Sequence, residues 1–283
     1  MGTHFLEWPY HIYLAYSNIK MSSTNTPSLD LPNSLQAEQM GPVLVVQLTR
    51  PAKRNALSDS TMQGLERIFA NIPGDVGAVV LHGEGDHFCA GLDLNELGGH
   101  DIVDGVLHAR MWQRVFDCIQ FGRVPVVAAL QGAVIGGGLE LACAAHIRVA
   151  EPSTFYALPE GQRGIFVGGG GSVRVPKLIG LARMADMLLT GRVFPAEEGY
   201  KIGLAQYLVE AGAGLSKALE LANKIAGNTR MTNFAILHAL PRIAETSQDT
   251  GLMLEALMSA VAQSAPEAQQ RVEQFLNKKA KSL

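Results

Sequence analysis

Two glutamates, Glu140 and Glu160, stand twenty positions apart in settings that a merely solvated carboxylate would not need. Glu140 comes shortly after three consecutive glycines, 136–138, and leads into the apolar segment 141–145, which predicts the first turn of a buried helix. Glu160 follows an apolar stretch and a proline, so we expect it where a strand gives way to a loop. Two carboxylates that reach one cavity from different elements can move a proton onto one atom and a water onto its neighbour.

Each glutamate also has a plainer interpretation. A glutamate in the first turn of a helix commonly complements the helix dipole at the protein surface. The apolar neighbours of Glu140 argue against that interpretation, because burying a carboxylate costs free energy and needs a strong reason. Together with the segment 78–94, the pair of glutamates favours catalysis.

The segment 78–94 is an apolar strand that breaks into a glycine-rich turn, and loops after buried strands often carry function. Its turn, Phe-Cys-Ala-Gly-Leu-Asp-Leu at 88–94, is one of three stretches that resemble the enoyl-CoA hydratase/isomerase (crotonase) superfamily. The other two are Leu-Thr-Arg-Pro-Ala-Lys-Arg-Asn-Ala-Leu-Ser at 48–58 and Gly-Ala-Val-Ile-Gly-Gly-Gly-Leu-Glu-Leu at 132–141. The resemblance covers residues 40 to 280 and implies an α/β fold with a crotonase-type spiral core of ββα turns.

The resemblance implies an oxyanion hole in which the backbone N–H groups of Ala90 and Gly137 bind a thioester carbonyl oxygen. Small residues suit this task, because donors must approach the oxygen closely, and each such donor contributes about a hundredfold or more to the rate. Glu140 and Glu160 match the two positions that hydratases of the family fill with glutamate, whereas isomerases commonly keep only the second.

Coenzyme A is expected as part of the substrate, with no permanently bound cofactor. The resemblance places Lys53 and Arg54 near the phosphates of the coenzyme, although most cations after a strand are simply exposed turn residues. The positions that match those around the adenine and pantetheine are Ala56, Gly91, Leu92, Asp93 and Leu94. Residues 275–279 resemble the terminal helix of the family, whose Phe and Lys often reach the coenzyme of a neighbouring subunit.

Composition agrees with an ordinary globular enzyme. The 283 residues are 47% hydrophobic and 17% charged, and the net charge of −3 offers no basic field that would recruit nucleic acid in bulk. The three cysteines are too far apart for a disulfide framework or a zinc site, so we expect a reducing cytoplasm. The eight histidines show no ligand spacing, and we expect no metal and no membrane span.

Periodicity predicts the elements that would position these residues. Buried strands are expected at 43–49, 77–82, 125–130 and 147–150. Helices are expected at 58–70 and 103–121, and beyond residue 210 at 214–227, 230–246, 250–263 and 266–279. The glycines 168–171 lack the Lys-Ser/Thr of a phosphate loop, so they predict backbone clearance at the acyl end of a pocket.

We therefore expect three parts in the chain. Residues 1–39 would be a leader and flexible segment, with Met21 as an alternative start, and residues 40–210 would be the α/β core with the CoA and acyl site. Residues 211–283 would form a helical oligomerisation region, since their apolar positions exceed what the core can bury, and the resemblance implies a homotrimer or a dimer of trimers.

The expected reaction is the addition of water to a 2-enoyl-CoA thioester, with Glu140 activating the water for Cβ and Glu160 delivering a proton to Cα. The stretch 157–171 is similar to the methylthioacryloyl-CoA hydratase branch, whose members also release the acyl group. Isomerisation and thioester hydrolysis use the same oxyanion hole and stay open. Some superfamily members bind RNA or act as inert assembly partners, but two retained glutamates and the lack of a basic patch argue against that role.

Overall fold

The computed structural model describes residues 30–98 and 101–280. Most of the predicted leader, including both Met1 and Met21, lies outside the described residues. Within them, no helix is both long and apolar enough to cross a membrane.

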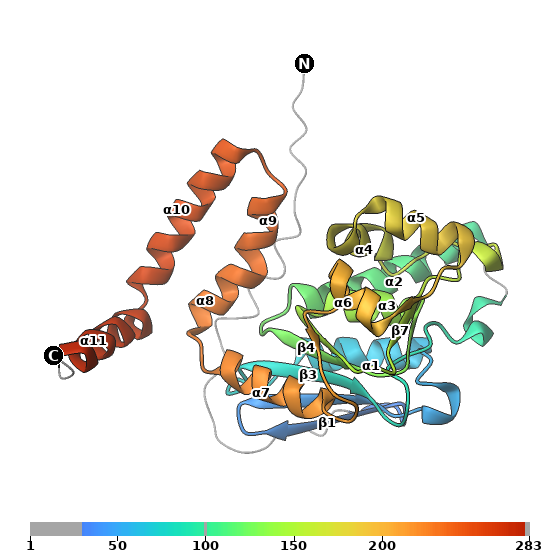
Figure 1. Ribbon diagram of the computed structural model, residues 1–283, viewed down its shortest axis with the longest axis horizontal. Helices are drawn as coiled ribbons and strands as arrows, with labels where there is room; N and C mark the ends of the chain where they lie inside the picture. Colours follow the sequence, from blue (N-terminus) through green and yellow to red (C-terminus); the bar gives the residue numbers. More distant parts are fainter. Residues whose placement is uncertain (1–29, 99–100, 281–283) are drawn as a thin grey trace.

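A six-stranded sheet forms the core, with its strands in the order β1-β2-β3-β4-β6-β9 (Figure 1). β1 and β2 form an antiparallel hairpin, and the other neighbouring pairs are parallel. The strands are β1 (Leu35–Met40), β2 (Val43–Leu48), β3 (Ala78–Gly83), β4 (Val126–Leu130), β6 (Ile147–Ala150) and β9 (Tyr207–Leu208). The parallel strands β3 and β4 are continuous apolar runs, as expected for strands that are covered on both faces.

Helices cover both faces of this sheet. Val79 and Leu81 of β3 lie in a large apolar cluster with side chains of α1 (Asp59–Ala70), α2 (Ile102–Gln120) and α3 (Gly137–Ala144). Ala78 and Val80 point to the other face, because side chains alternate along a strand, and they pack with α7 (Gly214–Ala226). The layer of α1, α2 and α3 is the one that carries Glu140.

A second, three-stranded sheet carries the approaches to both glutamates. Its strands are β5 (Ala133–Ile135), β7 (Phe155–Ala157) and β8 (Phe194–Pro195), in that order. β5 leads directly into α3 and Glu140, whereas β7 leads to Glu160. Because β5 and β7 pair in parallel, their carboxyl ends lie side by side, which brings the two glutamates to one place.

The remaining helices follow in chain order. Those beside the core are α4 (Gly171–Ile179), α5 (Leu181–Thr190) and α6 (Ala196–Ile202). The C-terminal ones are α8 (Arg230–Phe234), a π-helical turn (Ala235–Ala239), α9 (Leu240–Ala244), α10 (Gln248–Ser264) and α11 (Pro266–Ala280). Short 3₁₀ turns lie at Pro51–Lys53, Leu94–Leu97 and Gly161–Arg163. The helices α8 to α11 form an arm beside the core (Figure 1), which Arg242 of α9 contacts by stacking on the Phe121 ring.

The predicted α/β core and helical C-terminal region are confirmed. The predicted division at residues 39 and 40 falls inside β1, which pairs along its whole length with β2. α7 begins beyond the predicted division at 210 and 211 and packs on the core sheet. The helices after Gly227 are the ones that follow this packed helix.

Candidate active site

Glu140 lies in the first turn of α3, as predicted, and every residue of this helix is buried. The glycine at 136 has φ of +53°, and its N–H donates to the Ala157 carbonyl, so the helix starts tightly against β7. The Glu140 side chain is only 3% exposed, and the N–H of Gly171 donates to its Oε1 atom at 2.7 Å.

Burial raises the pKa of Glu140 to about 7, and the charge of Glu160 pushes it in the same direction. Hydrogen bonds from the N–H groups of Gly171 and Gly169 oppose this rise, as does the charge of Arg174. A carboxyl with a pKa near 7 exchanges protons readily at neutral pH, which suits general acid–base catalysis.

Glu160 immediately precedes the 3₁₀ turn Gly161–Arg163 that follows β7, close to the predicted end of a strand. Its residue is 7% exposed, and burial raises the pKa of its carboxyl. Within the described chain the buried Oε2 atom has no hydrogen-bond partner. Its Oε1 atom lies 2.7 Å from where a Cβ on Gly136 would be, so only glycine at 136 lets this carboxyl approach α3.

The glycine loop 168–171 closes over Glu140. A Cβ on Gly169 would lie 2.6 Å from the Phe116 ring and 3.2 Å from Glu140 Oε2, and one on Gly171 would lie 2.9 Å from Glu140 Oε1. These contacts leave no room for side chains at either position. Gly169 and Gly171 thus provide the predicted backbone clearance, and the space that they clear is around Glu140. A place for the loop at the acyl end of a pocket stays a prediction.

One of the two predicted oxyanion donors, the Ala90 N–H, already has a hydrogen-bond partner within the chain. The Ala90 N–H donates to the Arg54 carbonyl at 2.9 Å, so it is committed to holding the turn and does not face a substrate. The Leu92 N–H takes no part in the bridge to Leu57, where Leu57 donates to the Gly91 carbonyl and Asp93 donates to Leu57. Among the described residues, neither the Leu92 N–H nor the Gly137 N–H has a partner.

These two free N–H groups lie close together. A Cβ on Gly137 would be 3.4 Å from the Leu92 nitrogen, and a Cβ on Gly91 would be 3.1 Å from the Gly137 nitrogen and 2.7 Å from the Ile135 carbonyl oxygen. Gly91 also has φ of +91°, which other residues adopt only with strain. The turn is thus packed directly on the start of α3. The two N–H groups on this surface that have no partner in the described chain are therefore those of Leu92 and Gly137, whereas the sequence predicted Ala90 and Gly137.

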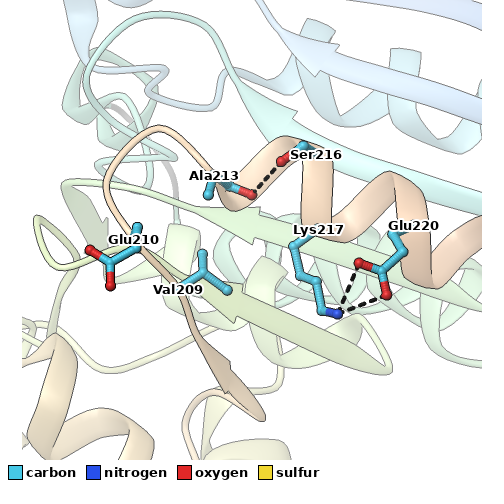
Figure 2. Close-up of a pocket in the computed structure, with 6 residues that line it drawn as sticks. All are labelled: Val209, Glu210, Ala213, Ser216, Lys217 and Glu220. Carbon is cyan, nitrogen blue, oxygen red and sulfur yellow. Dashed lines mark hydrogen bonds and ion pairs between the residues drawn. The ribbon is translucent and has the colours of Figure 1, made fainter.

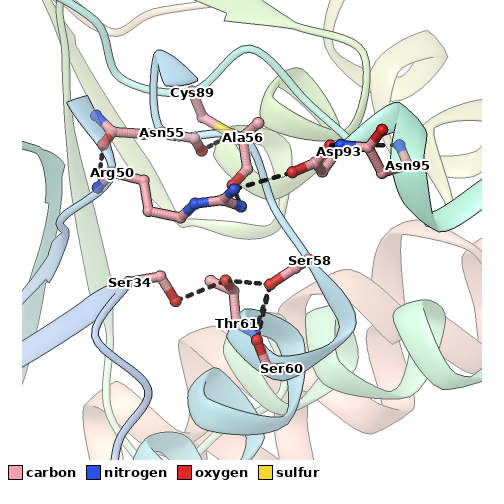
Figure 3. Close-up of polar contacts among 10 residues, drawn as sticks. All are labelled: Ser34, Arg50, Asn55, Ala56, Ser58, Ser60, Thr61, Cys89, Asp93 and Asn95. Atoms are coloured by element: carbon pink, nitrogen blue, oxygen red, sulfur yellow. Dashed lines mark hydrogen bonds and ion pairs between the residues drawn. The ribbon is translucent and has the colours of Figure 1, made fainter. Parts of the chain in front are cut away.

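A polar network holds this turn from behind (Figure 3). The Arg50 Nη2 atom lies 2.9 Å from Asp93 Oδ2, and Arg50 also donates to the Ala56 carbonyl. Asn55 donates from its amide to the carbonyl oxygens of Glu84 and His87. Hydrogen bonds from Arg50 and from the Asn95 N–H lower the pKa of Asp93. The Asp93 carboxylate is therefore engaged inside the protein.

The predicted coenzyme residues lie on the outer side of the same turn. Lys53 and Arg54 are exposed at the end of the 3₁₀ turn after β2. Leu94, which follows Asp93 in the sequence, is also exposed. Ala56 is half-buried. Lys53 is close enough to Asp93 for its charge to lower the pKa of that carboxyl. Contact of these residues with coenzyme A stays a prediction.

Sequence reasoning missed an aromatic wall on α2. The Trp112 Cζ3 atom lies 3.0 Å from where a Cβ on Gly137 would be, and the ring packs edge-on against Phe116 at 5.9 Å between centroids. Asp59, at the start of α1, accepts a hydrogen bond from Trp112 Nε1 at 3.3 Å and lies 2.7 Å from His108 Nε2. The aromatic residues of the predicted amphipathic helix were the available signal, because they share one helical face.

An open hollow of about 470 Å³ lies elsewhere, beside the start of α7 (Figure 2). Its lining includes the ion pair between Lys217 and Glu220, at 2.8 Å, and none of the predicted site residues. We therefore do not assign catalysis to it. Among residues 30–98 and 101–280, no group of three or more His, Cys, Asp and Glu side chains is placed to hold a metal ion.

Comparison with known proteins agrees with this arrangement. The sequence pattern of the enoyl-CoA hydratase/isomerase family matches residues 38–282. The short-chain-enoyl-CoA hydratase of Clostridium acetobutylicum is 32% identical over 79% of this chain and 87% of its own length. The enoyl-CoA hydratase EchA19 of Mycobacterium tuberculosis is 32% identical over 87% of this chain and 97% of its own length.

A solved structure from Rhodopseudomonas palustris, provisionally named as an enoyl-CoA hydratase, is 58% identical and superposes with a TM-score of 0.88. The match covers 91% of this chain and 100% of that one. An enoyl-CoA hydratase from Bacillus anthracis, 28% identical over 87% of this chain and 96% of its own, superposes with a TM-score of 0.81. The chain therefore belongs to the enoyl-CoA hydratase/isomerase family and is a lyase of the enoyl-CoA hydratase type.

Proposed function

We propose that this enzyme adds water across the double bond of a 2-enoyl-CoA thioester, using Glu140 and Glu160 as its two catalytic carboxyls. The observation that carries the proposal is the free, buried Oε2 atom of Glu160 next to a second buried carboxyl. An unpartnered buried oxygen costs free energy, and a substrate or water that binds it removes the cost. The free N–H groups of Leu92 and Gly137 supply the oxyanion site that an enolate needs.

In this mechanism the thioester oxygen binds between the Leu92 and Gly137 N–H groups, which draw electron density away from Cβ. Glu140, held by the Gly171 N–H, takes a proton from a water molecule while the oxygen of that water bonds to Cβ. The electron pair of the double bond moves toward the thioester, and Glu160 gives its proton to Cα. Burial raises the pKa of both carboxyls, so each exchanges protons closer to neutral pH than an exposed glutamate does.

Coenzyme A would extend from this site across the turn 91–94 toward Lys53 and Arg54. Both cations are exposed beside the turn, where phosphate groups could reach them. The Asp93 carboxylate supports the backbone of the turn through Arg50, so its contribution to coenzyme binding would come through the main chain.

The arm is proposed to assemble the enzyme as a homotrimer or a dimer of trimers. Its last two helices expose a series of large apolar side chains: Leu252, Met253, Leu254, Leu257, Val261, Val272, Phe275 and Leu276. Apolar surface of this extent usually marks an interface, because leaving it in water is unfavourable.

The test is turnover of crotonyl-CoA, followed by the loss of ultraviolet absorbance of the conjugated thioester. Glu140→Gln and Glu160→Gln should each lower kcat by about a hundredfold or more and leave KM nearly unchanged, since the amide keeps the shape and loses proton transfer. Glu84→Gln, at an exposed glutamate directly after β3, is the matched control. Near-normal turnover by either active-site variant would remove that residue from the mechanism.

The same assay separates the related reactions. The stretch 157–171 is the feature that favours a methylthioacryloyl-CoA substrate, so this thioester belongs in the panel, with release of free coenzyme measured by a thiol reagent. Thiol release together with hydration would support the hydrolytic variant. Conversion of a 3-enoyl-CoA to the 2-enoyl isomer without hydration would instead favour an isomerase.

A further inference from the structure

We propose that Arg174 is a positioning residue for Glu140, because it fixes the glycine loop whose Gly171 N–H orients the Glu140 carboxyl. This inference rests on the proposed role of Glu140 in hydration. Arg174 itself touches neither the thioester nor the water in this scheme and acts through the backbone of the loop.

The Arg174 side chain is 7% exposed and uses all of its nitrogens. Nη1 donates to the Gly169 carbonyl at 2.9 Å, Nη2 lies 2.5 Å from Asp117 Oδ1, and Nε donates to Gln120 Oε1 at 2.6 Å. The guanidinium therefore ties the loop to the C-terminal half of α2, the same helix whose Trp112 and Phe116 wall the site.

The loop is shaped around this guanidinium. Gly170 has φ of +99°, and a Cβ there would lie 2.3 Å from Arg174 Nη1. A run of four glycines has no side chains with which to anchor itself and is costly to order. Arg174 thus supplies a side-chain anchor next to the backbone N–H that holds Glu140.

The choice of arginine is specific. Burying a cation costs free energy that an ion pair with a half-exposed partner does not fully return, and the Asp117 side chain is 57% exposed. Arginine can meet three acceptors at once with its planar fork, whereas lysine offers a single point charge. The free-energy cost of burying this cation is explained if the geometry of the loop matters more for the enzyme than the stability of the folded state.

The charge of Arg174 also reaches Glu140. The ionisable groups around Glu140 are Arg174 from α4, Glu160 from the loop after β7, and Cys143 further along α3. α2 contributes Asp117 through its ion pair with Arg174, and β5 carries no ionisable side chain. The positive charge of Arg174 lowers the pKa of Glu140, whereas burial and the charge of Glu160 raise it.

The experiment compares Arg174→Gln, Arg174→Lys and Arg192→Gln, the last being an exposed arginine with two ion pairs that serves as the control. Arg174→Gln should lower kcat on crotonyl-CoA by about ten- to a hundredfold with KM changed less than about threefold, because a small misplacement of a catalytic group is costly. The acidic limb of its kcat–pH profile should move to higher pH. Arg174→Lys should lose turnover while keeping the limb near its original place, and Arg192→Gln should change neither.

A second measurement does not depend on turnover. Titration of the ¹³C-labelled Glu140 carboxyl by NMR, assigned with Glu140→Gln, should give a higher pKa in Arg174→Gln than in the unmodified protein. If the protein does not hydrate crotonyl-CoA, the proposed function fails while the titration still tests Arg174. Should Arg174→Gln not fold, Asp117→Asn removes the half-exposed partner of the guanidinium and should give a smaller loss of kcat. Unchanged kcat, pH profile and Glu140 titration in a folded Arg174→Gln variant would overturn the inference.

Discussion

The assignment of the Leu92 N–H, and not the Ala90 N–H, as an oxyanion donor leads to a direct test. Replacing one residue by its α-hydroxy acid turns the amide N–H into an ester oxygen and leaves the side chain unchanged. At Leu92 this change should remove one of two donors to the thioester oxygen. At Ala90 it should remove only the hydrogen bond to the Arg54 carbonyl, which measures 2.9 Å.

The two effects differ in size and in kind. Loss of one oxyanion donor lowers kcat by about 10² to 10³, or roughly 3 to 4 kcal/mol of transition-state stabilisation. Loss of a backbone hydrogen bond destabilises the folded state by about 1 kcal/mol, and more if the Arg54 carbonyl is left without a donor. The Leu92 ester should therefore fold normally and turn over slowly, whereas the Ala90 ester should be less stable and nearly as active.

The assay measures kcat at saturating crotonyl-CoA and the free energy of unfolding in urea for each ester. An ester at Gly137, made with glycolic acid, is the positive control, because its N–H is the second proposed oxyanion donor and has no partner among the described residues. A hundredfold loss of kcat in the Ala90 ester, with full activity in the Leu92 ester, would refute the assignment.

Three further outcomes are expected. Burial keeps the pKa of Glu140 above its ordinary value, so its contribution to stability is full below that ordinary value and is lost as pH rises toward about 7. Glu140→Gln should thus gain up to about 3 kcal/mol over the unmodified protein in urea unfolding at pH 8 and little at pH 4. Gly91→Ala should lower kcat by at least about tenfold in steady-state assays, because its Cβ would lie 2.7 Å from the Ile135 carbonyl oxygen. Removal of residues 248–283, which takes away α10 and α11, should convert a trimer to monomer or aggregate in light scattering; an unchanged trimer would contradict the assigned interface.

The parts of the site that were predictable are those encoded in contiguous sequence. The apolar run after Glu140 correctly predicted a buried helix, because a helix that is apolar on all sides must be covered. The continuous apolar strands β3 and β4 were equally clear. β1 was missed because most of its residues are exposed and half of them are polar, so neither alternation nor hydrophobicity marked it.

The parts that were not predictable depend on contacts between distant segments. Whether Ala90 or Leu92 offers a free N–H is decided by the Leu57 bridge and by the Arg54 carbonyl, and side-chain types carry no signal for either. Residue types gave no signal for the contacts of Arg174 either, because its partners Asp117 and Gln120 lie on a helix far away in the sequence. The site was thus foreseeable in its chemistry but not in the backbone that presents it.

The three glycines before Glu140 show how tightly that backbone is determined. At 136 a Cβ would lie 2.7 Å from Glu160 Oε1, and at 137 it would lie 3.0 Å from the Trp112 ring. At 138 it would lie 2.3 Å from the Cys89 carbonyl oxygen, where the turn that carries Leu92 packs on α3. Each glycine therefore admits a different neighbour: the second carboxyl, the aromatic wall and the turn that carries Leu92. Because the three neighbours come from three separate elements, the run of glycines is required by close approach at the site. Adding a side chain at any one of the three positions should therefore disturb a different part of the site.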